Sequence, residues 1–257
     1  MASHQYVYVM NRLSKAWPGG KEVLKNVSLS FFPGAKIGVL GLNGSGKSTL
    51  LKLCTRMLDI ESGVLKLDGA SISDYPLQQL RSQIAQVLQD PFLFGEPLSN
   101  NISYDDPDRA LERIWDAADA AALANTVREF PEQMNTLVGE RGVTLSGGQK
   151  QRAALARGLI RHAPVLILDD CFSAVDTETE EHILSRLKAL RTGKTTILVS
   201  HRVSTLRHTD RIVVLDEGRL VEAGHHDALV AANGLYAELE RLQTQGGIES
   251  LAVGDAV

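Results

Sequence analysis

The sequence contains few cysteines, few aromatic residues and no long apolar run. Its 257 residues include two cysteines, too few for a disulfide framework, which fits a reducing compartment. No apolar run approaches the roughly 20 residues that a membrane-spanning helix needs. The first residues, Met-Ala-Ser-His-Gln, lack the basic and apolar regions of a signal peptide. If the protein works at a membrane, we therefore expect another polypeptide segment to span it.

An excess of basic residues is also absent. Lys and Arg number 27 against 31 Asp and Glu, and the net charge of -4 gives no electrostatic reason to expect nucleic acid or an anionic membrane surface as a partner. The composition, 44% hydrophobic and 23% charged, is ordinary for an α/β protein. The length is sufficient for one large or two small domains.

One stretch, Gly-Leu-Asn-Gly-Ser-Gly-Lys-Ser at residues 41–48, matches the phosphate-binding pattern G-x-x-x-x-G-K-[ST]. A short buried strand is expected before it and a helix after it. Glycines let backbone N–H groups turn toward an anion, and the helix directs its unpaired N–H groups at the same phosphates. Lys47 adds a full charge, and the Ser48 hydroxyl is a ligand for Mg²⁺. The predicted nucleoside triphosphate site comprises Gly41, Asn43, Gly44, Ser45, Gly46, Lys47, Ser48 and Thr49.

Two further predicted strands end in polar residues. The apolar run 165–168 does not alternate, as expected for a central parallel strand, and it is followed by Asp169 and Asp170. Acids at the carboxyl end of such a strand face the crevice in which α/β folds bind ligands, so Asp169 is placed to hold Mg²⁺. His201 follows a strand predicted over 194–199. A single histidine is usually structural, but at this position it could contact the γ-phosphate or the attacking water.

Two motifs leave alternatives open. Trp17 lies in a turn between strands predicted over 6–10 and 23–31, where it either covers a sheet edge or offers a flat face to adenine. Leu-Ser-Gly-Gly-Gln at 145–149 precedes a predicted helix, with Ser146 as its N-cap. The two glycines of this motif either complete a plain helix cap or expose backbone N–H groups to a second anion.

Residues 92–163 are expected to form a helical lobe inserted into the sheet-based core. Within it, Asp108 is predicted to cap a helix with an apolar stripe. The stripe consists of Leu111, Ile114, Trp115 and Ala118. Beyond the lobe, Thr177 with Glu180 three residues later predicts a capping box at the start of another helix.

Together, the motifs resemble the nucleotide-binding domain of an ATP-binding cassette (ABC) protein over roughly residues 7–242. The matching motifs, in order, are an aromatic A-loop at Trp17, the phosphate loop, a Q-loop at Gln89, the signature Leu145, Ser146, Gly147, Gly148 and Gln149, a Walker-B strand at 165–169, a D-loop with Ser173 and Asp176, and the switch His201. The resemblance implies an α/β fold: a P-loop NTPase (RecA-like) core with an antiparallel β subdomain and an inserted α-helical subdomain.

The resemblance also implies a division of the chain. A single ATPase domain is expected over 1–244, with the core and β lobe in 1–88 and 163–244 and the helical subdomain in 89–162. Residues 245–257 show no periodicity and indicate a flexible tail.

In this family two domains pair head to tail, so that each ATP lies between one phosphate loop and the signature of the other domain. Trp17 then becomes the adenine platform, and Asp170 and His201 the catalytic residues. The implied Mg²⁺ ligands are Ser48, Gln89 and Asp169. The implied partners are a second nucleotide-binding domain and the transmembrane domain of an exporter, with no nucleic acid. The implied location is cytoplasmic, at the inner face of the membrane when assembled, with the chain soluble by itself.

Residues after about 52 resemble exporter-type domains in particular. Glu140-Arg141-Gly142 is similar to the exporter X-loop, and residues 90–94 resemble the segment that meets a transmembrane coupling helix. Phe92 and Phe94 would then contact the partner, although burial in the helical lobe is an equally simple interpretation.

One departure from the family pattern is Asp170, because the family usually has Glu after the Walker-B Asp. The shorter side chain withdraws the carboxylate by roughly 1.5 Å, one C–C bond, and a displacement near 1 Å can cost about a hundredfold in rate. We expect ATP binding to survive and hydrolysis to be slow. An intact signature together with Asp in place of Glu resembles one half of heterodimeric exporters, so a heterodimer is favoured over a homodimer.

A second departure is that residues 6–52 resemble the first domain of ABC-F translation factors, which are ribosome-associated. The rest of the chain lacks a second cassette, the linker between cassettes and the usual Glu-Pro-Thr after the Walker-B Asp. The sequence therefore favours a chimera spliced in the helix after the phosphate loop over an unusual natural exporter domain. Two alternatives to an exporter ATPase follow: an ABC-F-like regulator, and an engineered chimeric domain that binds nucleotide without physiological transport.

Overall fold

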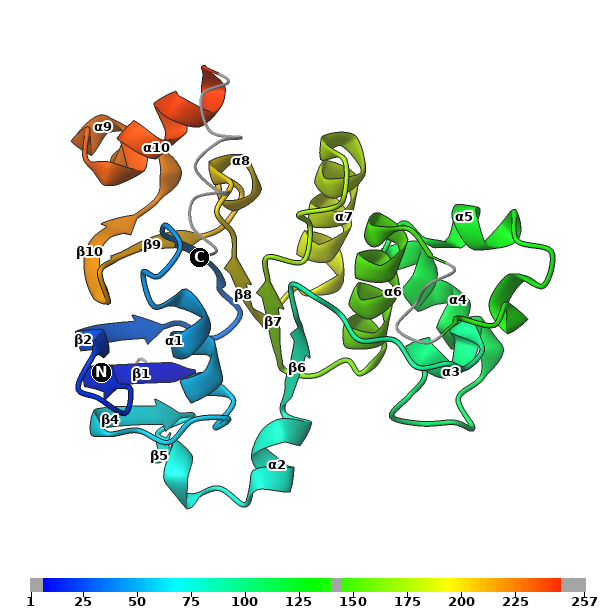
Figure 1. Ribbon diagram of the computed structural model, residues 1–257, viewed down its shortest axis with the longest axis horizontal. Helices are drawn as coiled ribbons and strands as arrows, with labels where there is room; N and C mark the ends of the chain where they lie inside the picture. The colour runs from blue at the N-terminus through cyan, green and yellow to red at the C-terminus, as the bar shows by residue number, and fades with distance from the viewer. Residues whose placement is uncertain (1–6, 140–144, 246–257) are drawn as a thin grey trace. The chain divides into compact units, whose positions relative to one another are not determined.

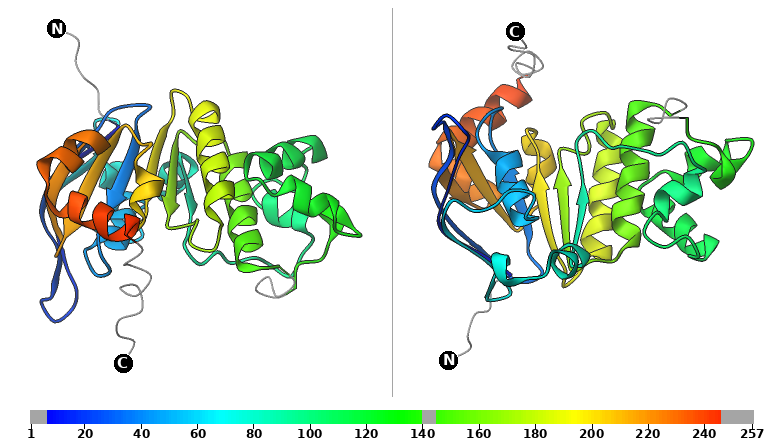
Figure 2. Two further views of the ribbon diagram at one scale, coloured as in Figure 1. Left: turned by 90° about the horizontal axis from the view of Figure 1, so that it is seen from above. Right: turned by 60° about the horizontal axis from the view of Figure 1, so that its bottom comes forward.

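The computed structural model describes residues 7–139 and 145–245, which form two compact units (Figures 1 and 2). The first unit contains the described residues up to Arg81 and from Gly193 onward, and the second spans Ser82–Thr192. The predicted X-loop, Tyr6 and all but the first residue of the predicted tail lie outside the described residues.

The first unit contains an antiparallel sheet of strand order β2-β1-β4-β5. Its strands are β1 (Tyr8–Ala16), β2 (Glu22–Phe31), β4 (Ser62–Leu67) and β5 (Ala70–Ser71). Along β2 the side chains of Val27, Leu29 and Phe31 are buried, whereas Ser28 is exposed and Ser30 half-buried. In the sequence these three apolar residues alternate with the two serines, which predicts a strand with one buried face, and the structure confirms this alternation.

The first unit also contains the strands around the phosphate loop. They are β3 (Lys36–Leu40), β8 (Thr195–Val199), β9 (Arg211–Asp216) and β10 (Arg219–Gly224). β3 pairs in parallel with β8 on one side and β9 on the other, and β10 pairs antiparallel to β9. Residues 37–40 are all buried, as expected for a strand in the middle of a parallel sheet.

The first unit has five α-helices and one 3₁₀ turn among its described residues. They are α1 (Lys47–Cys54), η1 (Ile72–Asp74), α2 (Leu77–Ser82), α8 (Val203–Leu206), α9 (His226–Ala232) and α10 (Leu235–Thr244). α1 follows β3 directly and buries Leu50, Leu51 and Leu53. The Tyr8 hydroxyl donates to the Cys54 carbonyl oxygen at 3.2 Å, which joins β1 to the end of α1.

The second unit contains the parallel strand pair β6 (Ile84–Val87) and β7 (Val165–Asp169) and a set of helices. The helices are α3 (Leu98–Ile102), α4 (Leu111–Ala120), α5 (Ala124–Arg128), η2 (Gln133–Asn135), α6 (Gly147–Ile160) and α7 (Thr177–Leu190). α6 packs against α3 and α4. The predicted helical character of this part of the chain is thus present. None of the described helices, in either unit, has both the length and the apolar character that crossing a bilayer requires.

Two predicted helix starts are wrong. α4 begins at Leu111 with Ala110 at the N-cap, because Asp108 lies in a preceding turn in which the Arg109 N–H donates to the Asp106 carbonyl oxygen. Leu111 of the predicted stripe is 55% exposed, whereas Ile114 is buried.

The start of α7 was predicted one residue too late. Its N-cap is Asp176, whose carboxylate accepts the Thr179 N–H at 2.9 Å. Thr177 is therefore the first helical residue and does not form the predicted capping box with Glu180. A carboxylate at a helix N-terminus also interacts favourably with the helix dipole, which favours Asp over the neighbouring Thr.

Candidate functional site

The phosphate loop of the first unit connects β3 to α1, so the predicted strand, loop and helix are present in order. Gly46 is the N-cap of α1 and has φ 101°, and Gly44 has φ 80°, both in the left-handed region that favours glycine. A Cβ on Gly46 would lie 2.6 Å from the Val23 carbonyl oxygen, whereas one on Gly44 would meet nothing within 4 Å. The loop is thus held against β2 at Gly46 and open at Gly44.

The polar groups of this loop fit a phosphate chain. Lys47 Nζ donates to the carbonyl oxygens of Gly41 at 2.6 Å and Leu42 at 2.9 Å, which holds the ammonium beside the loop backbone. Among the described residues, the Ser45 hydroxyl is buried and has no hydrogen-bond partner. A buried polar atom of this kind is normally satisfied, and a phosphate oxygen would satisfy it. The Ser48 side chain is exposed at the start of α1.

Trp17 and His201 also belong to the first unit. Trp17 follows β1 in a turn in which the Gly20 N–H donates to its carbonyl oxygen at 3.0 Å. Its side chain is 37% exposed, which is compatible both with stacking on adenine and with covering the sheet edge. His201 follows β8 and is half-buried. Ser200 Oγ accepts the Arg202 N–H at 3.0 Å and so shapes the backbone around His201.

The signature motif of the second unit forms the start of α6. Ser146 Oγ accepts the Gln149 N–H at 3.3 Å, and Gln149 Oε1 accepts the Ser146 N–H at 2.9 Å, a complete capping box. The prediction of Ser146 as the N-cap is therefore confirmed. Leu145, the first residue of the signature, is buried.

The two signature glycines lie against the D-loop of the same unit. A Cβ on Gly148 would approach the Ala174 carbonyl oxygen to 2.6 Å, and one on Gly147 would lie 3.2 Å from the Ala174 Cβ. The close approach to a backbone oxygen is a structural reason for glycine at position 148, in addition to the two alternatives read from the sequence.

Gln151 joins three of the motifs within the second unit, and sequence reasoning missed it. Its side chain, 5% exposed, donates from Nε2 to Ser173 Oγ at 2.8 Å and to the Gln89 carbonyl oxygen at 3.3 Å. Its Oε1 accepts the Ala174 N–H at 2.9 Å. The signature helix, the D-loop and the Q-loop backbone are thereby bonded to one amide. The sequence carries no signal for this, since the partners lie 22, 23 and 62 positions away.

The Walker-B strand and its acids also lie in the second unit. The first four residues of β7 are buried, and Asp169 and Asp170 at its end are half-buried. Asp170 has φ 46°, a left-handed conformation that Asp tolerates better than most residues. Burial raises the pKa of the Cys171 thiol, and the negative charge of the adjacent Asp170 raises it further.

Two other predicted residues of the second unit lie outside the Walker-B strand. The Gln89 side chain is exposed beyond the end of β6. In the D-loop, the backbone N–H of Thr179 lowers the pKa of Asp176.

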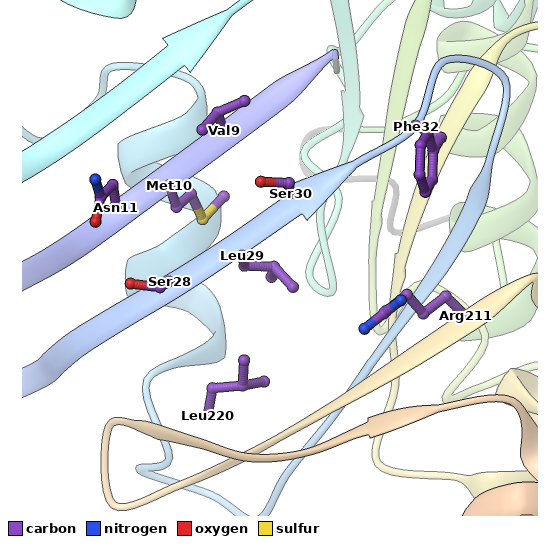
Figure 3. A pocket seen from close by; sticks show the side chains of 9 residues that line it. All are labelled: Val9, Met10, Asn11, Ser28, Leu29, Ser30, Phe32, Arg211 and Leu220. Atoms are coloured by element: carbon purple, nitrogen blue, oxygen red, sulfur yellow. The ribbon is translucent and has the colours of Figure 1, made fainter. Parts of the chain in front are cut away.

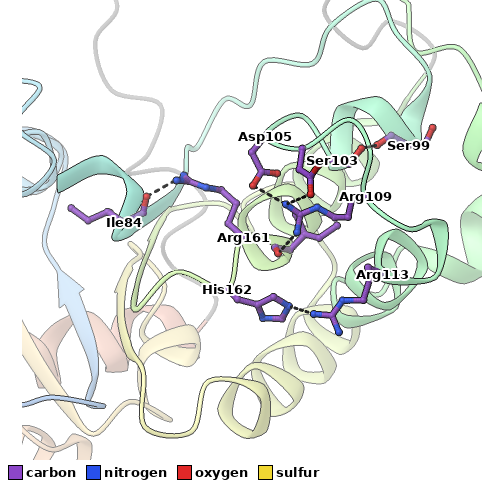
Figure 4. Close-up of polar contacts among 10 residues, drawn as sticks. Ile84, Ser99, Ser103, Asp105, Arg109, Arg113, Arg161 and His162 are labelled. Carbon is purple, nitrogen blue, oxygen red and sulfur yellow. Dashed lines mark hydrogen bonds and ion pairs between the residues drawn. The ribbon is translucent and has the colours of Figure 1, made fainter. Parts of the chain in front are cut away.

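The far end of α6 is held by arginines (Figure 4). Arg109 donates to the Ile160 carbonyl oxygen at 2.9 Å and forms an ion pair with Asp105. Arg113 Nη2 lies 2.9 Å from His162 Nε2. The signature helix is thus anchored at both ends within the second unit.

Arg157 in α6 organises the segment after the Q-loop. It donates to the carbonyl oxygens of Asn101 at 2.6 Å and Phe92 at 2.8 Å, and to Asn101 Oδ1 at 2.9 Å. Its guanidinium lies 5.7 Å from the Phe94 ring centroid, and Phe94 stacks on Tyr104 at 4.6 Å. Of the two predicted contact aromatics, Phe92 is 56% exposed and Phe94 is half-buried.

The first unit contains a pocket of about 570 Å³ (Figure 3). It opens between β1, β2 and the β9–β10 hairpin, with Phe32 and Arg211 at one end and Leu220 at the other. None of the predicted nucleotide-binding residues lines it.

The predicted site residues are therefore divided between the two units. Trp17, the phosphate loop and His201 are in the first; Gln89, Asp169, Asp170, the signature and the D-loop are in the second.

Comparison with known proteins gives a consistent result. The family model "ABC transporter" matches residues 24–173. The chain is 45% identical over 226 residues to an ATP-dependent lipid A-core flippase of Burkholderia orbicola, covering 88% of this chain and 38% of the relative. A flippase of the same name from Pseudomonas fluorescens is 43% identical over 245 residues, covering 95% of this chain and 41% of the relative. The chain thus spans about two fifths of the length of these relatives.

A solved structure, a bacterial Atm1-family ABC exporter with ATP bound, superimposes with a TM-score of 0.90 at 36% identity, covering 95% of this chain and 42% of that chain. This establishes the predicted α/β fold with its P-loop core and antiparallel β subdomain.

The comparisons give no support to a chimera with an ABC-F protein. The Pseudomonas fluorescens flippase and the exporter structure each cover 95% of the 257 residues, which leaves about 12 unmatched, so both matches extend over most of the segment before residue 52. Since the family model covers residues 24–173, more than half of the chain, the protein belongs to the ABC transporter family.

Proposed function

We propose that the chain is the ATP-binding and ATP-hydrolysing domain of an ABC exporter, which pairs head to tail with a second such domain and drives a transmembrane partner. The phosphate loop is the observation that carries this proposal. Its left-handed glycines, the Lys47 ammonium beside the loop carbonyls and the unsatisfied Ser45 hydroxyl together suit a triphosphate. The similarity to an exporter solved with ATP supports the choice of nucleotide.

The remaining residues take roles that the family resemblance supplies. Trp17 stacks on adenine, His201 contacts the γ-phosphate, and Asp170 orients the attacking water. The signature, Leu145, Ser146, Gly147, Gly148 and Gln149, contacts the ATP held by the partner domain, and Ser173 and Asp176 of the D-loop lie at the same interface.

Mg²⁺ is the proposed cofactor, with Ser48, Gln89 and Asp169 as its protein ligands. Their hydroxyl, amide and carboxylate oxygens are the hard donors that this ion prefers, and a bound Mg²⁺ neutralises charge on the β- and γ-phosphates. Few protein ligands are needed, because Mg²⁺ in such sites keeps several waters.

We further propose that hydrolysis at this site is slow because Asp170 is shorter than the Glu usual in the family. A carboxylate withdrawn by roughly one C–C bond, about 1.5 Å, places the attacking water less favourably. A heterodimer whose other half supplies the Glu would compensate.

The test is steady-state Mg-ATP hydrolysis against protein concentration for the parent, Asp170→Glu and Asp170→Asn. We expect Glu to raise the rate by about a hundredfold and Asn to abolish the residual activity, with ATP affinity unchanged in both. The rate should rise faster than linearly with concentration if two domains assemble the site. Equal rates for the parent and Asp170→Glu would refute the proposal of a weakened site. ATP binding without hydrolysis in all three proteins would refute the proposed ATPase activity.

Partner choice is tested separately by co-purification with exporter transmembrane domains and with ribosomes. We expect association with the former, because the relatives that align over most of the chain are named as flippases and an exporter. Retention on ribosomes alone would favour the ABC-F-like alternative.

A further inference from the structure

The C-terminal helix α10 contacts α8 (Figure 1), and the switch histidine lies two residues before α8 begins at Val203. Gln243, near the end of α10, donates from Nε2 to the His201 carbonyl oxygen at 2.6 Å. Its Oε1 accepts the Val203 N–H at 2.7 Å. Both ends of one planar amide therefore bind the two peptide groups that flank Arg202.

This amide replaces a helix cap that the local sequence does not supply. Val203 is the first residue of α8, and Arg202 at the N-cap position makes no side-chain capping bond. An uncapped helix start leaves N–H groups unsatisfied, and Gln243 satisfies the first of them from 40 residues away. On the preceding side, Ser200 Oγ holds the Arg202 N–H at 3.0 Å. The backbone from Ser200 to Val203 is thus hydrogen-bonded at consecutive positions.

α10 is itself firmly attached to the first unit, so it is a fixed point for this contact. Glu222 of β10 accepts the N–H groups of Leu235 at 2.5 Å and Tyr236 at 3.2 Å, at the start of the helix. Tyr236 is fully buried, and its hydroxyl lies 2.8 Å from His226 Nδ1. Leu239 is also buried. The amide of Gln243 therefore extends from an anchored helix.

We propose that Gln243 is a positioning residue, which sets the place of the His201 ring at the γ-phosphate by holding the His201 and Val203 peptide groups. The inference rests on the proposed ATPase function, because it assigns to α10 a role in hydrolysis. Loss of the two bonds frees the switch backbone to move, and a displacement near 1 Å in a catalytic group can cost about a hundredfold in rate. ATP binding depends on the phosphate loop and is unaffected.

The experiment compares Gln243→Met with the parent chain. Methionine has a similar volume and no amide, so packing is kept while both hydrogen bonds are lost. Thr244→Ala is the matched control, because the Thr244 hydroxyl bonds to the Glu240 carbonyl oxygen of its own helix. We expect Gln243→Met to lower kcat by tenfold or more with unchanged ATP affinity, and to lower the melting temperature by a few degrees, because two hydrogen bonds of the folded state are lost. Thr244→Ala should leave all three quantities at parent values.

Histidine-selective NMR provides a readout that does not depend on turnover. The His201 ring signals, assigned by their loss in His201→Ala, should shift or broaden in Gln243→Met and remain in place in Thr244→Ala. Parental kcat in Gln243→Met, or a fall in ATP affinity that accompanies a lower melting temperature, would overturn the proposal. If the parent binds ATP and does not hydrolyse it, the proposed function fails, and the NMR comparison still decides whether Gln243 positions His201.

Discussion

Replacement of Arg157 by Met should destabilise the second unit substantially. The guanidinium makes three hydrogen bonds, two to backbone carbonyl oxygens and one to Asn101 Oδ1, and it lies within 6.0 Å of the Phe94 and Tyr104 ring centroids. A hydrogen bond that involves a charged group contributes about 1.5–3 kcal/mol, and each cation–π contact about 0.5–1 kcal/mol. These terms do not add, and burial, which lowers the pKa of Arg157, offsets part of them. We therefore expect the free energy of unfolding to fall by about 3 kcal/mol in Arg157→Met.

The assays are urea-induced unfolding of the full chain, which gives the free energy of unfolding, and thermal unfolding, which gives Tm, both followed by far-UV circular dichroism. For a domain of 150–250 residues, about 3 kcal/mol corresponds to a fall in Tm of about 6–12 °C. Arg113→Met is the matched control. Arg113 is an exposed arginine of the same unit that contacts His162, so its loss should change the stability by less than about 0.5 kcal/mol. Equal effects for the two variants would refute the view that Arg157 organises the segment after the Q-loop.

Three further predictions concern the helix cap, a buried thiol and the phosphate loop. Ser146→Ala removes half of the capping box and should lower the stability by about 1 kcal/mol in denaturant titration; an unchanged midpoint would contradict the role of the cap. Burial raises the pKa of Cys54 from 9.0 to about 12, so iodoacetamide at pH 8 should modify it only after unfolding, and rapid modification of the native chain would contradict this. Because that pKa is raised on folding, its contribution to stability is present below pH 9.0 and is lost as the pH rises to about 12. Gly46→Ala should destabilise the chain more than Gly69→Ala. Both glycines have positive φ, but only a Cβ on Gly46 would meet Val23 within 3.0 Å, so equal denaturation midpoints for the two variants would show that φ alone matters.

The parts of the fold that depend on local sequence could be predicted. The residues of β3 indicated a short buried strand, and the unbroken apolar run of β7 indicated a buried parallel strand. The alternation in β2 indicated a strand with one buried face. The N-cap of α6 was also predicted correctly, because a serine directly before an expected helix favours that position. The reciprocal bonds between Ser146 and Gln149 became evident only in the structure.

The errors arose where two good caps stand close together or where a turn intervenes. Asp176 and Thr177 are adjacent and both suit an N-cap, and the choice depends on where the preceding D-loop enters the helix. Asp108 precedes α4 in sequence, but a turn at Arg109 delays the helix to Leu111.

The contacts that join distant segments could not be predicted. Gln151 and Gln243 are ordinary glutamines on helices, and the sequence does not show that they bind residues 62 and 42 positions away. Glutamine on a helix usually faces solvent. Their partners become evident only when the strands and loops are placed in space.

The close approach between Gly148 and Ala174 limits where a distance probe can report on motion in this chain. The Ala174 carbonyl leaves no room for even a methyl group on Gly148, and Gln151 of the signature helix bonds Ser173 and Ala174 of the D-loop. The signature turn and the D-loop should therefore move as one body. Fluorophore or spin-label pairs placed on these two segments would give a constant distance through a reaction cycle. A pair with one label on this body and the other on the first unit is the arrangement that could detect a change.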